Sequence, residues 1–156
     1  MTARELQIAI MNDLAALFEG RKYKDPEGNM VAPSIFKQQL PKRQSEEDEQ
    51  PFPYIIVRLN FGNIEAHTDP HTVSVLLVIG AYDDDPANEG HDSVMEMIEL
   101  IHRHYEERPI IPGTAFKFTL PFNWVLQDEE SYPYFIGVAS TVWNITGPRR
   151  SVTQYT

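Results

Sequence analysis

The run from residue 73 to residue 82, just ahead of an acidic loop, is almost entirely apolar. Leu76 and Val78 lie on one side of this predicted strand. The opposite side carries Val73, Val75, Leu77 and Ile79. A strand that is apolar on both sides is typical of the middle of a sheet. Residues 94–105 then repeat apolar positions at helical spacing, so we expect a helix that covers this sheet.

The same reading predicts the other elements of the chain. Thr2 and Glu5 fit a capping box, so a first helix is expected to run to about residue 19. The remaining predicted strands are residues 34–40, 53–61, 114–120 and 134–145. Short links join most of these strands. The order therefore predicts an α+β fold, a mainly antiparallel β-sheet of about five strands with two α-helices packed on one face.

The chain has 156 residues, a length that predicts one domain over residues 1–156. We expect a mobile charged loop at about residues 41–50 and a frayed tail at about residues 148–156. The chain has no cysteine, which excludes disulfides and thiol chemistry. No apolar run is long enough to span a membrane and no signal-peptide pattern is present, so the expected location is a cytoplasm.

The formal net charge is −10, and the acidic residues are concentrated after residue 43. Residues 1–43 carry seven basic and five acidic groups, whereas the rest of the chain carries six basic and eighteen acidic groups. Binding to nucleic-acid phosphates needs clustered lysine and arginine. The charge therefore argues against a nucleic-acid-binding surface, although it suits a surface that must not adhere to DNA.

The acidic loop after residue 82 is the main candidate for site chemistry. It contains Asp83, Asp84 and Asp85, and His91 follows nearby. Several oxygen ligands that converge can hold a hard cation. However, the spacing does not match an EF-hand, and the loop has no lysine or arginine to meet a phosphate. The preferred interpretation is a solvated turn whose acids favour the next helix N-terminus.

No pattern in the chain predicts a catalytic residue or a cofactor site. The sequence has no HExxH, GxSxG, Walker or GxGxxG motif. Some apolar and charged positions instead suit a subunit or partner interface, because they fall outside the expected core. These interface candidates are Ile8, Leu100, Glu46, Glu47, Asp48, Leu76 and Val78. Leu100 is expected to project from the polar side of the second helix.

Several segments between about residues 50 and 145 together resemble one family of viral proteins. They are Phe52-Pro53-Tyr54, the strand at residues 73–82 with Gly80-Ala81-Tyr82, Gly90-His91-Asp92, Pro109-Ile110, the FTLPFNW run from Phe118 to Trp124, Pro133-Tyr134-Phe135 and the strand with Trp143. This combination resembles the tail terminator, or tail completion, proteins of long-tailed bacteriophages, including those encoded by prophages.

The resemblance implies a structural protein rather than an enzyme, with no cofactor. It implies a homo-oligomeric ring, typically a hexamer, that caps the tail tube and joins it to the head–tail connector in the neck. DNA is then expected to pass through the lumen without specific binding. The expected location is the virion tail, after assembly in the cytoplasm of the bacterial host. Acidic residues suit a ring through which DNA passes.

Other functions remain open at the level of sequence. Within the same class, the chain fits another head–tail connector or minor tail component. A metal-dependent enzyme that uses Asp83, Asp84, Asp85 and His91 is the alternative from a different class. A small adaptor that binds a peptide along a sheet edge is a third possibility, and it predicts a monomer.

Overall fold

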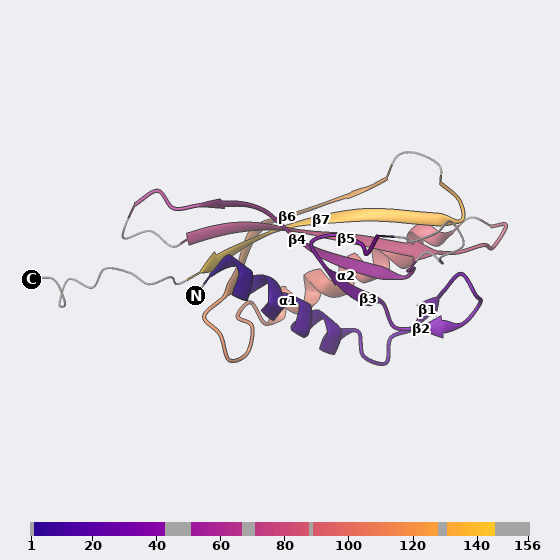
Figure 1. Ribbon diagram of the computed structural model, residues 1–156, viewed down its shortest axis with the longest axis horizontal. Coiled ribbons are helices and arrows are strands. Elements are labelled where there is room, and N and C mark those ends of the chain that lie inside the picture. The colour runs from indigo at the N-terminus through magenta and orange to yellow at the C-terminus, as the bar shows by residue number, and fades with distance from the viewer. Residues whose placement is uncertain (1, 43–50, 67–70, 88, 128–130, 146–156) are drawn as a thin grey trace, which may run out of the picture.

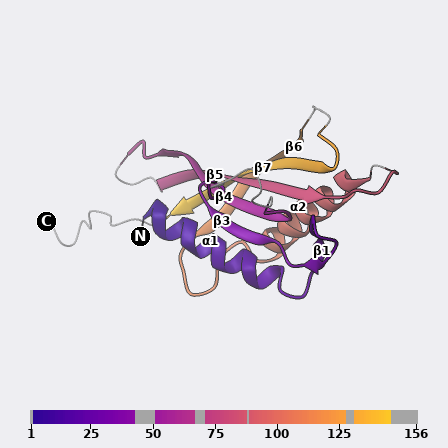
Figure 2. The same cartoon turned by 45° about the vertical axis from the view of Figure 1, so that its right-hand side comes forward.

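The computed structural model describes residues 2–42, 51–66, 71–87, 89–127 and 131–145. Two helices cover one face of a five-stranded sheet, as Figures 1 and 2 show from two directions. The helices are α1 (Ala3–Leu17) and α2 (Gly90–Glu107). The strands of the sheet are β3 (Ser34–Lys37), β4 (Tyr54–Asn63), β5 (His71–Tyr82), β6 (Lys117–Leu126) and β7 (Tyr134–Ile145). The α+β prediction is confirmed.

The sheet has the order β3-β4-β5-β7-β6, which places β5 at its centre. The pairs β4–β5, β5–β7 and β7–β6 are antiparallel, but β3 runs parallel to β4. The expectation of a mainly antiparallel sheet was therefore wrong, and the sheet is mixed. Alternation of apolar residues fixes which face a side chain takes but not the direction of the neighbouring strand.

A further two-stranded sheet forms between α1 and β3, where the sequence analysis predicted no strand. Strands β1 (Tyr23–Lys24) and β2 (Met30–Val31) pair in antiparallel fashion. Asp25 holds the turn between them, since one of its carboxylate oxygens accepts hydrogen bonds from the backbone N–H groups of Glu27 and Asn29. An aspartate that caps its own turn is a common device in short hairpins.

The core lies between the helices and the sheet. The side chains of α1 that enter it are Leu6, Ile10 and Leu14, and those of α2 are Val94, Met97, Ile98, Ile101 and Tyr105. From the sheet, Val75, Leu77 and Ile79 are almost fully buried, as the alternation in β5 predicted. Trp143 of β7 is fully buried, and its indole N–H donates to the Thr141 hydroxyl at 2.9 Å. This polar contact satisfies a donor that burial removes from water.

A buried glutamine fixes α1 to the sheet edge. The side-chain amide of Gln7, 2% exposed, donates to the carbonyl oxygen of Val57 at 2.7 Å and to Gln38 Oε1 at 2.9 Å. Gln38 also accepts from the backbone N–H of Leu59 at 3.0 Å. These bonds join α1, the end of β3 and β4, and they satisfy polar groups away from water.

The helix α2 begins four residues before the apolar repeat that predicted it. Its first residue is Gly90, and Glu89 is its cap residue. A Cβ atom at position 90 would lie 2.2 Å from Cδ2 of Phe135. Glycine is therefore required at position 90, because the backbone there contacts the ring of Phe135. This contact depends on β7, a strand far along the chain.

Candidate functional site

The face of the sheet opposite the helices carries a row of aliphatic side chains. We call the positions of β4–β7 on this side the open face. The cross-strand register places Ile56, Val78, Val138 and Val125 opposite one another on four neighbouring strands. Ile56 is buried, the two central valines are half-buried, and Val125 on the edge strand is 61% exposed. Apolar groups in such a row gain most when a partner removes them from water.

The open face is also unlike the rest of the protein in charge. In the described parts of β4–β7, Arg58 and Lys117 are the charged residues on this side, and no carboxylate occupies any of these positions. Nε of Arg58 donates to the carbonyl oxygen of Gln38 at 2.9 Å, which fixes this side chain near the β3 end. A protein with a net charge of −10 thus has one broad surface that is weakly basic.

Part of the open face is covered by the chain itself. Phe52, Tyr54 and Ile56 are buried in a second apolar cluster on this side, and Val78 packs against them. The rings of Phe52 and Tyr134 lie 4.7 Å apart between centroids. The uncovered part therefore lies over β5, β7 and β6. The interface candidates Leu76 and Val78 are both half-buried at its border.

Two further groups of exposed apolar residues were not selected from the sequence. Phe61 and Ile64, at the end of the β4–β5 hairpin, are 65% and 61% exposed. Leu120 and Trp124 of the edge strand β6 are 67% and 51% exposed. In sequence, Phe61 continues the alternation of Val57 and Leu59, which lie on the helix side of β4. The register shifts between Leu59 and Phe61, and this irregularity turns Phe61 to the other face.

The outer side of α2 contrasts with the open face. Its exposed acidic residues are Asp92, Glu96, Glu99, Glu106 and Glu107, and Arg103 is the exposed basic residue of this helix. Three of these acids have side-chain partners: Glu96 accepts from the Tyr23 hydroxyl at 3.1 Å, Glu106 lies 3.3 Å from His102, and Asp92 lies 3.2 Å from His91. Because this surface of α2 carries five carboxylates and one guanidinium, it has a strong negative potential.

The acidic loop is held as a structural turn. Asp83 accepts from the backbone N–H of Asp85 at 2.9 Å, and Asp85 accepts from that of Ala87 at 2.9 Å. Asp84 forms an ion pair with Lys24 of β1. This hydrogen bond from Lys24 holds the pKa of Asp84 below its usual value, and the Asp84 carboxylate raises the pKa of Lys24. The three carboxylates thus have separate partners and do not converge.

His91, the other metal candidate, does not join these aspartates. Its Nε2 lies 3.2 Å from the carboxylate of Asp92, and both side chains are more than half exposed. Within the described residues, no group of three or more histidine, aspartate or glutamate side chains is placed to hold a metal ion. The described helices also include none that is long and apolar enough to cross a membrane.

The remaining interface candidates have mixed outcomes. Ile8 is 47% exposed on α1, so it is available for a contact. Leu100 is instead half-buried and packs against the core, so the prediction that it projects was wrong. The reason is that α2 packs across three strands, β5, β7 and β6, which widens its apolar side. Glu46, Glu47 and Asp48 lie outside the described residues.

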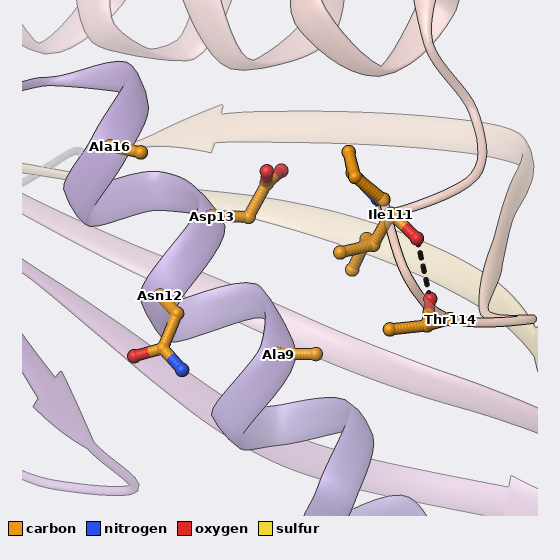
Figure 3. Close-up of a pocket in the computed structure, with 7 residues that line it drawn as sticks. Ala9, Asn12, Asp13, Ala16, Ile111 and Thr114 are labelled. Carbon is orange, nitrogen blue, oxygen red and sulfur yellow. Dashed lines mark hydrogen bonds between the residues drawn. The ribbon is translucent and has the colours of Figure 1, made fainter.

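A pocket of about 330 Å³ lies between α1 and the turn that precedes β6 (Figure 3). It is lined by Ala9, Asn12, Asp13, Ala16, Ile111, Pro112 and Thr114. The main polar groups at its wall already have partners: Asp13 lies 2.8 Å from Nε2 of His104, and the Thr114 hydroxyl donates to the carbonyl oxygen of Ile111 at 2.7 Å. The pocket is therefore a structural groove rather than a catalytic centre.

Beside this pocket, Tyr105 is fully buried against Trp143, with ring centroids 4.9 Å apart. Its hydroxyl makes no hydrogen bond within the described residues. Burial first, and the nearby carboxylate of Asp13 second, raise the pKa of Tyr105 far above its ordinary value. The folded state therefore favours the neutral phenol, and Tyr105 acts as a core residue.

Comparison with known proteins adds no family to this picture. No protein-family model matches the chain, and no curated protein matches it.

Proposed function

We propose that this chain is a structural protein of a long-tailed bacteriophage or prophage, a tail terminator that forms a ring on the end of the tail tube. The observation that carries the proposal is the open face, where a row of aliphatic residues is exposed or half-buried on a surface without carboxylates. Such a surface is suited to protein contacts. The sequence resemblance to tail terminators supplies the identity of the assembly.

In this role the protein needs two kinds of contact. One joins neighbouring subunits into a ring, which requires two different patches on each subunit. The other joins the ring to the tail tube on one side and to the head–tail connector on the other. The exposed Phe61 and Ile64 at the β4–β5 hairpin end are suited to one of these contacts, because they lie apart from the core. DNA passes through the ring without specific binding.

The alternatives have less support. A metal-dependent enzyme needs converging ligands, whereas Asp84 is paired with Lys24 and its neighbours bind backbone N–H groups. A peptide-binding adaptor needs an accessible sheet edge. One edge, β3, has four residues, and the other, β6, is interrupted by Pro121 and a register shift between Thr119 and Asn123. Proline and bulges block the addition of a strand.

The test is a capping assay on tail tubes. Tube subunits encoded by the same genome are polymerised with and without this protein, and tube lengths are measured by electron microscopy. The proposal predicts shorter tubes that carry extra density at one end. Unchanged tube lengths, with no protein bound to tube ends, would overturn it. Another connector component is indicated if the protein binds the neck complex but not the tube.

A further inference from the structure

The two sides of the molecule differ in charge in a way that suits contact between copies. The open face carries Arg58 on β4 and Lys117 on β6, and none of its positions in β4–β7 is a carboxylate. The helices lie on the opposite side of the sheet (Figure 1). On that side, the outer surface of α2 exposes five carboxylates and one arginine. Opposite potentials on opposite sides attract when copies stack in the same orientation.

We infer that the open face of one copy docks on the acidic outer side of α2 in the next copy. This inference rests on the proposed ring-forming function and names the surfaces that meet. The occupant of the open face is a second copy of this chain. The contact joins two different patches, so it continues from copy to copy and closes when the rotation per subunit allows.

The dimensions of the two surfaces match. Three strands at about 4.8 Å spacing, over about ten residues of about 3.3 Å each, give the uncovered part of the open face a flat area of roughly 480 Å². A stable interface buries about 800 Å² on each partner, so this part supplies more than half of one such interface. The helix α2 has 18 residues and is therefore about 27 Å long, which matches the length of the face.

The two surfaces also differ in what each gains. Docking removes the partly exposed apolar side chains of Val78, Val138 and Val125 from water, which is favourable. Arg58 lies on β4 and Lys117 on β6, and these strands are separated by β5 and β7, so the two residues are at opposite edges of the open face. On α2, Glu99 and Glu107 are both exposed and lie eight residues apart, about 12 Å along the helix. Two separated positive groups thus meet an extended negative surface.

A front-to-back contact makes a prediction that a symmetric contact does not. Variant A carries Arg58→Glu and Lys117→Glu, which make its open face acidic. Variant B carries Glu99→Lys and Glu107→Lys, which leave three carboxylates and three positive groups on the outer side of its α2. Alone, A presents like charges at every contact, and B presents a basic open face to a helix without net negative charge, so both are expected to stay monomeric. In an equal mixture, the basic open face of B meets the acidic α2 of A, and the acidic open face of A meets the new lysines of B, so assembly is expected to return.

The experiment measures solution mass by sedimentation velocity for the wild type, A, B and their mixture. A control with Arg21→Glu and Lys22→Glu has the same net charge as A but changes exposed residues outside both surfaces. This control is expected to assemble as the wild type does. Circular dichroism confirms that every variant is folded, and a variant that fails to fold is replaced by its single substitutions.

The outcomes separate this inference from the proposed function. Assembly of the mixture, with A and B each at least tenfold weaker alone, supports front-to-back docking. Assembly of B alone, with loss only in A, shows contact between two open faces and overturns the inference. A wild type that is monomeric at every concentration overturns it too. The capping assay is repeated with variants A and B. If each variant caps tail tubes as efficiently as the wild type does, the inference is overturned but the proposed function stands.

Discussion

The two faces of one sheet share the same strands but have different physical roles. On the helix face, Leu77 is 1% exposed and packs in the main core. Its neighbour Leu76 lies on the open face and is only half-buried. The same residue type, one position apart, therefore contributes to folding on one side and remains available for contact on the other. The predictions below separate these two roles.

The largest effect is expected from identical substitutions on the two faces. Leu77→Ala removes a fully packed side chain and is expected to lower the free energy of unfolding by about 2–5 kcal/mol. Leu76→Ala is expected to cost about 1 kcal/mol or less in the dissociated protein, because its side chain already meets solvent. Urea denaturation at low protein concentration measures both. Equal losses would mean that the open face is a second core.

A smaller effect is expected where a strand must approach α2 closely. A Cβ at Gly137 would lie 2.6 Å from Cγ1 of Val94 and 3.2 Å from Cδ2 of Leu126. Gly137→Ala is therefore expected to lower the free energy of unfolding by about 1–3 kcal/mol through overpacking. Ser140→Ala, on the open face of the same strand, is the control and should change stability little. Thermal denaturation followed by circular dichroism compares them.

The buried tyrosine on the helix face makes the free energy of unfolding depend on pH in the alkaline range. The pKa of Tyr105 is raised on folding, so its contribution is fully present below the unfolded value of about 10 and is lost as pH rises above it. The expected loss from Tyr105 is about 1.4 kcal/mol per pH unit above that value. Denaturation between pH 9 and 11 should show a shallower decline in Tyr105→Phe. An equally steep decline of stability with pH in both proteins would contradict the conclusion that burial raises the pKa of Tyr105.

The smallest effect is expected in the acidic loop. Asp84→Asn removes an exposed ion pair with Lys24, and Asp85→Asn leaves an oxygen that still accepts a hydrogen bond. Exposed pairs add little stability, so the double variant should assemble and unfold as the wild type does. Because the pKa of Asp84 is lowered on folding, its small contribution is lost only as pH falls through the folded value. Calorimetry with Mg²⁺, Ca²⁺ and Zn²⁺ checks for metal binding, and a carboxylate-dependent signal would revive the enzyme hypothesis.

The sequence predicted the faces of the strands better than their arrangement. The alternation in β5 assigned Val75 and Leu77 to the core, and the helical spacing assigned Ile98 and Ile101 to it, because burial leaves a direct periodic signal. The direction of β3 leaves no such signal. Sequence analysis also ended the predicted strand at residue 120, but β6 continues through Pro121 to Leu126 by means of a register shift.

The candidate interface was only partly predictable for the same reason. Leu76 and Val78 were selected because both sides of β5 are apolar. Val125, in contrast, lies beyond the predicted strand at residues 114–120, and its exposure depends on how the edge strand pairs with β7. The sequence alone could not show that the open face lacks carboxylates. Only the strand register identifies the residues on that face, Arg58 and Lys117 among them. A surface made from four strands is a tertiary property.

The most direct test of the central claim is the solution mass of the wild type and of Val125→Asp, measured by light scattering over a range of concentrations with negative-stain imaging. Val125 is 61% exposed, so the substitution leaves the core intact while it places a charge in the aliphatic row. We predict closed rings of the wild type and monomers of the variant. A wild type that stays monomeric, or a variant that assembles equally well, would contradict the account.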